Sequence, residues 1–298
     1  MKMIEFKVEL NKRIEYIISV LNRYLPAHVK DNQIVVEAMA YSVFAGGKRM
    51  RPIFMLETFN ILNGKGRKIE SFMAAIEMIH TYSLIHDDLP ALDNDDLRRG
   101  IPTCHVKYGE NIAILAGDAL LNRAFEVIIE EALINPEIGI IKAMVEIGKA
   151  SGTNGMIGGQ VADILNENKP IDIELLNYIH LHKTSAMIEA SFVVGALLAN
   201  ASETEIEIFR KIGKNIGLAF QIQDDLLDVM GTEDELGKPI NSDQKNKKIT
   251  YVALKGVAES TQIVYEQLEE AVEHLKSFDL ARCEFLLAFI DYLKTRNH

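Results

Sequence analysis

The chain has 298 residues, of which 48% are hydrophobic and 25% are charged. This apolar content excludes an intrinsically disordered chain and is sufficient for a sizeable core. The formal net charge is −11, whereas a nucleic-acid-binding protein normally carries a basic surplus, so no nucleic-acid partner is expected. The length exceeds the usual single-domain size but suits one large helical domain, which we expect to cover residues 1–298.

The N-terminus and the cysteines indicate a cytoplasmic protein without a transmembrane segment. Residues 1–7 alternate charged with apolar residues and lack the apolar centre of a signal peptide. Cys104 and Cys283 have no metal-ligand spacing and form no disulfide framework, as expected in a reducing compartment. The longest apolar run, Met187–Leu198, is too short to span a bilayer and predicts a buried helix.

Apolar residues recur at spacings of three, four and seven along most of the chain. The first helix is expected from Ile4 to Leu21, ending before Pro26. Similar patterns predict helices over Ile34–Phe44, Ser71–His86, Asn111–Leu133, Ile138–Lys149, Glu174–Ala199, Glu203–Leu227, Tyr251–Leu275 and Ala281–Arg296. No segment shows the sustained period of two that is typical of strands, so the sequence predicts an all-α chain. The longest polar interruption, Gly231–Lys248, predicts a mobile or functional loop.

An acidic segment follows the helix expected at Ser71–His86. Its carboxylates are Asp87, Asp88, Asp93, Asp95 and Asp96. A solvated helix end is one interpretation. However, negative charge at a helix C-terminus opposes the helix dipole, and adjacent carboxylates repel each other unless a cation neutralises them. Asp87 and Asp93 are six residues apart, so a bulge or kink at Pro90 is needed for both to bind one cation.

A second acidic cluster lies near the end of the helix expected at Glu203–Leu227. Asp224 and Asp228 are four residues apart and therefore project from one helix face. The flanking residues expected to be buried are Phe220, Leu226, Leu227 and Val229. Carboxylates among apolar residues need a partner, and oxygen ligands suit Mg²⁺, which fills its remaining positions with water and phosphate oxygens. The two clusters therefore predict a metal-bound diphosphate between them.

Together with basic and glycine-rich segments, these clusters resemble the motifs of the trans-prenyl diphosphate synthases. The motifs occur in the family's order as Gly46–Pro52, His80 with Asp87–Asp93, Arg98–Gly100, Gly158–Asp163, Lys183–Thr184 and Phe220–Asp228. The resemblance implies the isoprenoid synthase fold, a single all-α domain with about ten or more helices around a central active-site cavity. It also implies a homodimer.

The resemblance implies an enzyme that adds isopentenyl diphosphate head-to-tail to an allylic diphosphate, with three Mg²⁺ ions bound alongside the diphosphate. The implied metal ligands are Asp87, Asp93 and Asp224, and the other implied catalytic residues are Asp88, Asp225, Asp228 and Lys183. The residues implied to bind isopentenyl diphosphate are Lys48, Arg51, His80 and Arg99. Those implied to bind the allylic diphosphate are Arg98, Lys183, Thr184, Gln221, Lys238 and Lys248.

Tyr82 and Ser83, five and four positions ahead of Asp87, are expected to set product length. On a helix Tyr82 lies about 7.5 Å along the axis from Asp87. A bulky ring there would form the floor of the cavity and stop elongation at C15, as in bacterial farnesyl diphosphate synthases. A tyrosine of the ordinary core, and the C20 product of plant-type geranylgeranyl diphosphate synthases, are the alternatives.

Other interpretations stay open at this point. A class I terpene cyclase is also all-α, but its second motif requires Ser or Thr at the Asp228 position and Glu at the Thr232 position. A non-catalytic subunit of a heteromeric synthase is expected to lack one aspartate cluster, and both are complete. Outside the family His80 would be read as a hydrogen-bonded core histidine. Four glycines either contact a ligand or permit close helix packing: Gly152, Gly155, Gly158 and Gly159. Asn241 stands where the family usually has glycine.

Overall fold

The computed structural model describes residues 1–27, 30–230 and 249–295, and within these residues it is built of helices with one small hairpin. The elements are α1 (Met3–Tyr24), α2 (Gln33–Val43), α3 (Met50–Ile61), α4 (Lys68–Asp87), β1 (Leu97–Arg98), β2 (Ile101–Pro102), α5 (Cys104–Tyr108), α6 (Glu110–Ile134), α7 (Ile138–Ser151), α8 (Met156–Leu165), α9 (Ile173–His180), η1 (Leu181–Ser185), α10 (Ala186–Leu198), α11 (Glu203–Met230), α14 (Tyr251–Leu275) and α15 (Leu280–Lys294). The predicted all-α class is confirmed.

The chain forms two compact units, each assembled from separate stretches of sequence. The α4 unit comprises Lys12–Ile53 and Arg67–Glu137. The α11 unit comprises Met1–Asn11, Phe54–Gly66 and Ile138–His298. The chain passes between the units within α1 and within α3, so neither unit is a continuous segment.

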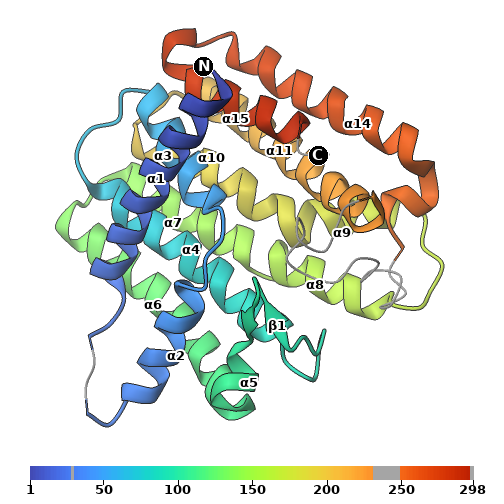
Figure 1. The fold of residues 1–298 in the computed structure, drawn as a ribbon. Coiled ribbons are helices and arrows are strands. Elements are labelled where there is room, and N and C mark those ends of the chain that lie inside the picture. Colours follow the sequence, from blue (N-terminus) through green and yellow to red (C-terminus); the bar gives the residue numbers. More distant parts are fainter. Residues whose placement is uncertain (28–29, 231–248, 296–298) are drawn as a thin grey trace. The chain divides into compact units, whose positions relative to one another are not determined.

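Helix α4 forms the core of its unit. It is buried along almost its whole length, and it packs against α6 and α2 (Figure 1). A helix that is apolar on all sides belongs in an interior, because no face of it favours water. The C-terminal end of this helix carries the first acidic cluster, so the packing holds that cluster on a rigid support.

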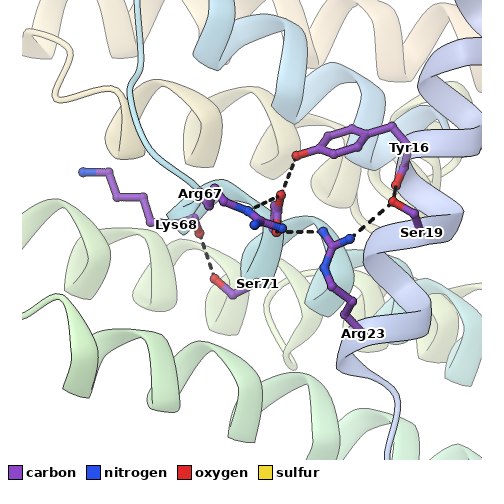
Figure 2. Close-up of polar contacts among 7 residues, drawn as sticks. Tyr16, Ser19, Arg23, Arg67, Lys68 and Ser71 are labelled. Carbon is purple, nitrogen blue, oxygen red and sulfur yellow. Dashed lines mark hydrogen bonds and ion pairs between the residues drawn. The ribbon is translucent and has the colours of Figure 1, made fainter.

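A carboxylate at the start of α4 fastens this helix to α1. The side chains of Tyr16, Arg23 and Arg67 converge on one carboxylate in Figure 2. The hydrogen bonds identify this carboxylate as that of Glu70. The Tyr16 hydroxyl donates to Glu70 Oε1 at 2.7 Å, and Arg23 donates to Oε2 at 2.8 Å. Arg67 donates to both oxygens, at 3.0 and 3.1 Å. Burial alone would raise the pKa of Glu70, but these hydrogen bonds outweigh it and lower the pKa below its usual value.

Helix α11 is the central helix of the other unit, where it packs against α10 and α14 (Figure 1). The apolar run Met187–Leu198 is buried in α10, as predicted. Its one charged residue, Glu189, accepts a hydrogen bond from Arg210 of α11 at 2.7 Å. In the same unit the Phe54 ring of α3 stacks on Phe192 of α10, with ring centroids 4.8 Å apart.

Two of the expected long helices are interrupted. The segment Glu174–Ala199 consists of α9, a single π-helical turn (η1) and α10. The segment Tyr251–Leu275 is α14, which is kinked at Gly256, where φ is 77° and ψ is 163°. Only the first interruption contains a motif, because η1 includes Lys183 and Thr184.

Several elements were not expected from the periodicity. Helices α3, α5 and α8 are additions to the expected set, as is the hairpin of β1 and β2.

The prediction that Val229 is buried is wrong, since 42% of this residue is exposed. Both cysteines are buried free thiols. Among the residues that the structure describes, no helix combines the length and apolar character needed to cross a membrane.

Candidate active site

The loop that follows α2 is shaped around an arginine of the hairpin. Gly46 and Gly47 have φ values of 96° and 108°, a region that favours glycine. Arg99 donates through Nη1 to the Gly46 carbonyl. A Cβ on Gly47 would lie 2.5 Å from Arg99 Cζ, so any other residue at this position would displace the guanidinium group. The two glycines of the motif therefore make room for the guanidinium group of Arg99, a residue predicted to bind isopentenyl diphosphate.

The same loop is fastened to α4 by a buried ion pair. Arg49 is 4% exposed and donates to Glu77 Oε1 at 2.6 Å and to the Val43 carbonyl at 2.5 Å. Both terminal nitrogens of the Arg49 guanidinium group, Nη1 and Nη2, therefore donate to other groups of the protein. The neighbouring cations predicted to bind isopentenyl diphosphate differ in burial, with Lys48 exposed and Arg51 half-buried. Arg49 is therefore a structural residue of the motif.

His80 lies half-buried on α4 in a strongly basic environment. Burial lowers its pKa well below the usual value, and the charges of Arg51, Arg99, Arg98 and Arg49 lower it further. The structure thus brings His80 together with Arg51 and Arg99, three of the four residues predicted to bind isopentenyl diphosphate. A neutral imidazole among cations is the arrangement that an anionic group would stabilise.

The first acidic cluster is folded back on the end of α4. Its helix ends at Asp87, and the amide of Asp93 donates to the Asp87 carbonyl at 2.9 Å. The turn between them closes with the Leu92 amide on the Leu89 carbonyl at 2.9 Å. The required departure from helical geometry near Pro90 is therefore present, as a helix end followed by a tight turn. It brings together the backbones of two predicted metal ligands that one straight helix would have separated.

Asp88 is held by an arginine of the hairpin. Arg98 donates through Nε to both carboxylate oxygens at 2.8 and 2.9 Å, and through Nη2 to Oδ1 at 2.5 Å. Asp88 is 3% exposed, and burial raises its pKa although the hydrogen bonds of Arg98 lower it. Arg98 is predicted to hold the allylic diphosphate, but in this structure it neutralises a buried carboxylate of the acidic cluster instead.

In the α11 unit the glycine motif of α8 packs on the π-helical turn. A Cβ on Gly159 would lie 2.1 Å from the backbone nitrogen of Lys183. The structure therefore shows the close helix packing that was one of the two interpretations of this glycine. The Lys183 ammonium group donates to Asp163 Oδ2 at 2.6 Å, which joins two of the predicted motifs. Single π-helical turns within helices occur frequently at functional sites.

The second acidic cluster continues this network. Thr184 donates to Gln221 Oε1 at 2.7 Å, so the residues predicted to hold the allylic diphosphate lie side by side. Asp225 is 3% exposed and accepts from the Tyr251 amide at 2.9 Å, which links α11 to the first residue of α14. Asp228 is buried, whereas Asp224 is half-buried. Lys238 and Lys248 lie outside the described residues.

One residue of this network was missed by the sequence analysis. His180 is buried, its Nε2 lies 3.8 Å from Asp225 Oδ2, and its ring stacks on Tyr251 with centroids 5.4 Å apart. Burial lowers its pKa to about 4. None of the sequence motifs includes His180. Its connection to the site is visible only in the folded structure, where it lies next to Asp225 and close to Lys183 along the chain.

The donor atoms are those that Mg²⁺ prefers. Asp87, Asp93 and Asp224 offer carboxylate oxygens, and the folded turn places the first two next to each other. Among the described residues, no three His, Cys, Asp or Glu side chains gather closely enough to hold an ion alone. Mg²⁺ takes few carboxylates and completes its shell with phosphate oxygens and water. That the two clusters face one another across a diphosphate stays a prediction.

Comparison with known proteins identifies the family. The polyprenyl synthetase family model matches residues 32–287. The chain is 43% identical over 297 residues to a farnesyl diphosphate synthase of Micrococcus luteus, covering 99% of this chain and 100% of the relative. It is also 43% identical over 290 residues to a geranylgeranyl diphosphate synthase of Cyanophora paradoxa, covering 97% and 96%.

Solved structures agree with this similarity. An FPP/GFPP synthase of Zymomonas mobilis superposes with a TM-score of 0.86 at 31% identity, covering 97% of this chain and 98% of that one. A geranyltransferase of Helicobacter pylori, complexed with magnesium and isoprenyl diphosphate, has a TM-score of 0.84 at 31% identity, with 96% of each chain covered. The chain belongs to the polyprenyl synthetase family and is a trans-prenyl diphosphate synthase.

Proposed function

We propose that this single-domain enzyme adds isopentenyl diphosphate to dimethylallyl diphosphate to give geranyl diphosphate, and then adds a second isopentenyl diphosphate to give farnesyl diphosphate, the C15 product. In each addition the allylic C–O bond breaks as diphosphate leaves, the double bond of isopentenyl diphosphate adds to the resulting carbocation, and the released diphosphate takes up the proton that the adduct loses. A buried apolar site would protect that cation from water. The family supports the reaction type, and the following contacts support the roles of individual residues.

The basic group around His80 is the proposed site for isopentenyl diphosphate. Arg51, Arg99 and His80 are close enough for the arginine charges to depress the histidine pKa. Lys48 of the same loop is exposed and would complete the set. Arginine forks match the oxygens of a diphosphate bidentately. Binding the anion would offset the mutual repulsion of these cations.

The allylic diphosphate is proposed to bind through Lys183, Thr184 and Gln221. Lys183 donates to Asp163, and its neighbour Thr184 donates to Gln221. Asp87, Asp93 and Asp224 would hold Mg²⁺, three ions in the proposed complex, and bound Mg²⁺ would make diphosphate a better leaving group. Asp88, Asp225 and Asp228 are buried and would act in support. Arg98 would reach the substrate only by giving up its hydrogen bonds to Asp88.

The burial of Tyr82 is the observation that supports the assignment of the C15 product. The residue is 6% exposed, one helical turn before His86, and its pKa is raised to about 12 by burial and by the Asp87 charge. Tyr82 is five residues before Asp87 on the same helix, about 7.5 Å along its axis. From this position the ring would limit the length of an allylic chain bound at the acidic cluster. Ser83 is half-buried, and its hydroxyl donates to the His80 carbonyl at 2.9 Å. The alternative is the C20 product of the geranylgeranyl diphosphate synthases among the relatives.

Replacing Tyr82 tests this assignment. Tyr82→Ala should shift the main product from C15 to longer diphosphates, because the cavity loses its floor. Tyr82→Phe keeps the ring and removes only the hydroxyl, so it should retain the C15 product. The measurement is chromatography of the dephosphorylated products after reaction with Mg²⁺, geranyl diphosphate and isopentenyl diphosphate. An unchanged C15 profile in Tyr82→Ala would remove Tyr82 from the determination of product length.

We also propose that the enzyme is a homodimer, and an exposed apolar stripe on α6 supports this. Ile114, Leu115, Ile129 and Leu133 are all exposed, the last to 79%. Leu115 and Leu133 are eighteen residues apart, which is about five turns at 3.6 residues per turn, so they lie on one face. We expect sedimentation equilibrium to give about twice the mass of one chain, and Ile129→Glu to reduce it. A wild-type mass of one chain would contradict the proposal.

A further inference from the structure

An imidazole ring next to the first aspartate connects α4 to α6. His86 Nε2 lies 3.2 Å from the Ile114 carbonyl oxygen, and a carbonyl can only accept, so this nitrogen carries the proton. The same nitrogen lies 4.0 Å from Asp118 Oδ1. Both partners are on α6. The ring is thus held across the interface between the two helices, at the position just before Asp87.

The ring has room there only because residue 117 has no side chain. A Cβ on Gly117 would lie 2.1 Å from His86 Nε2 and 2.5 Å from its Cδ2. Gly117 is well inside α6, where glycine weakens a helix relative to alanine. The His86 imidazole explains why glycine occupies position 117, since a larger residue would overlap the ring.

The His86 ring also contacts Tyr82. The two aromatic rings are nearly perpendicular, at 81°, with centroids 5.8 Å apart. Within the described residues the buried Tyr82 hydroxyl has no hydrogen-bond partner. A phenol without a hydrogen bond to direct it is positioned by the side chains that pack on it. His86 is such a side chain, and it is itself fixed by the Ile114 carbonyl.

We propose that His86 and Gly117 are positioning residues for product length: the imidazole, seated on Gly117, holds the Tyr82 ring in the place where it ends the cavity. This inference rests on the proposed role of Tyr82. Helix α6 would then contribute to product specificity. Its residues Ile114 and Gly117 position the His86 ring, and this ring positions Tyr82. Neither His86 nor Gly117 needs to touch the substrate.

The test compares product lengths of His86→Ala, Gly117→Ala and the double variant with Mg²⁺, geranyl diphosphate and isopentenyl diphosphate. Each single variant should raise the ratio of longer products to C15 by about tenfold, the usual effect of a small change in an apolar pocket. The double variant should match His86→Ala alone, because a methyl group at residue 117 meets no ring once the imidazole is gone. Gly148→Ala, whose Cβ would have no neighbour within 4 Å, should leave the ratio unchanged.

The outcomes separate this inference from the function on which it rests. If Tyr82→Ala lengthens the product while His86→Ala and Gly117→Ala keep the wild-type ratio, His86 has no positioning role although the function stands. If Tyr82→Ala also keeps the ratio, the proposed floor is wrong and the inference falls with it. Because His86→Ala removes atoms without a clash, it gives an answer even if Gly117→Ala fails to fold. A lower melting temperature with an unchanged ratio in His86→Ala would likewise overturn the proposal.

Discussion

Single side chains in this protein repeatedly join segments that are far apart in the sequence. Glu70 receives hydrogen bonds from Tyr16 and Arg23, which are 54 and 47 residues away. Arg49 reaches Glu77 over 28 residues. One sequence gives no indication of such pairs, because charged residues at these separations have many possible partners. The motif residues were predictable because their types and spacing are specific, whereas the groups that support them were not.

The carboxylate of Glu70 gives a prediction of pH-dependent stability. Folding lowers its pKa from 4.5, so its contribution is complete above pH 4.5 and is lost as the pH falls through the lower folded value. Glu70→Gln should reduce the free energy of unfolding by about 1 kcal/mol at pH 7, since Arg67 is exposed and its share is screened. The difference between variant and wild type should shrink as the pH falls below 4.5 in urea titrations.

The control for this prediction is Glu259→Gln, which removes an exposed ion pair with Lys255 on α14. Exposed pairs of this kind contribute at most about 0.5 kcal/mol. A loss in Glu70→Gln that is no larger than in the control, or that does not change with pH, would contradict the assigned role of Glu70.

The long helices follow from the sequence, and the short ones do not. Periodic apolar residues locate α6 and α11 to within a few residues at each end. Helix α3 begins directly after a glycine-rich loop and contains Pro52, and α8 includes Gly158 and Gly159. Proline and paired glycines disfavour a helix, so the local sequence of each segment predicts a loop. Tertiary packing overrides that preference, as the fit of Gly159 against the turn at Lys183 illustrates. The two-residue strands are too short to show any period.

The contact between α8 and η1 yields a prediction for a single methyl group. Gly159→Ala would place its Cβ 2.1 Å from the Lys183 backbone nitrogen, and backbone cannot rotate away as a side chain can. We expect a loss of about 1–3 kcal/mol in unfolding free energy and a lower kcat, because the turn that carries Lys183 must shift. Urea unfolding and steady-state kinetics measure both effects.

Gly148→Ala in α7 is the matched control for this change. Its new Cβ would meet no atom within 4 Å, so the better helix propensity of alanine should stabilise the protein by about 0.5–1 kcal/mol. If Gly159→Ala were as stable and active as the control, the close approach of α8 to η1 would be unimportant for the site.

The molecule as a whole reconciles an acidic chain with anionic substrates. The net charge of −11 includes the two aspartate clusters, where Mg²⁺ would reverse the local field. The structure places arginines beside the first cluster and around His80. In the α11 unit Lys183 contacts Asp163, and Thr184 contacts Gln221. The sequence could not predict that Asp88 and Asp225 would already be hydrogen-bonded by the protein, because those partners are set by packing.

The proposed function of this chain is the Mg²⁺-dependent synthesis of farnesyl diphosphate. The most direct test incubates the purified protein with Mg²⁺, geranyl diphosphate and isopentenyl diphosphate and chromatographs the products, alongside Asp87→Ala and Asp224→Ala. We predict a C15 diphosphate from the wild type, and no turnover from either variant while circular dichroism shows unchanged helicity. A main product of C20, a hydrocarbon, or Mg²⁺-dependent turnover retained by both variants would contradict the account.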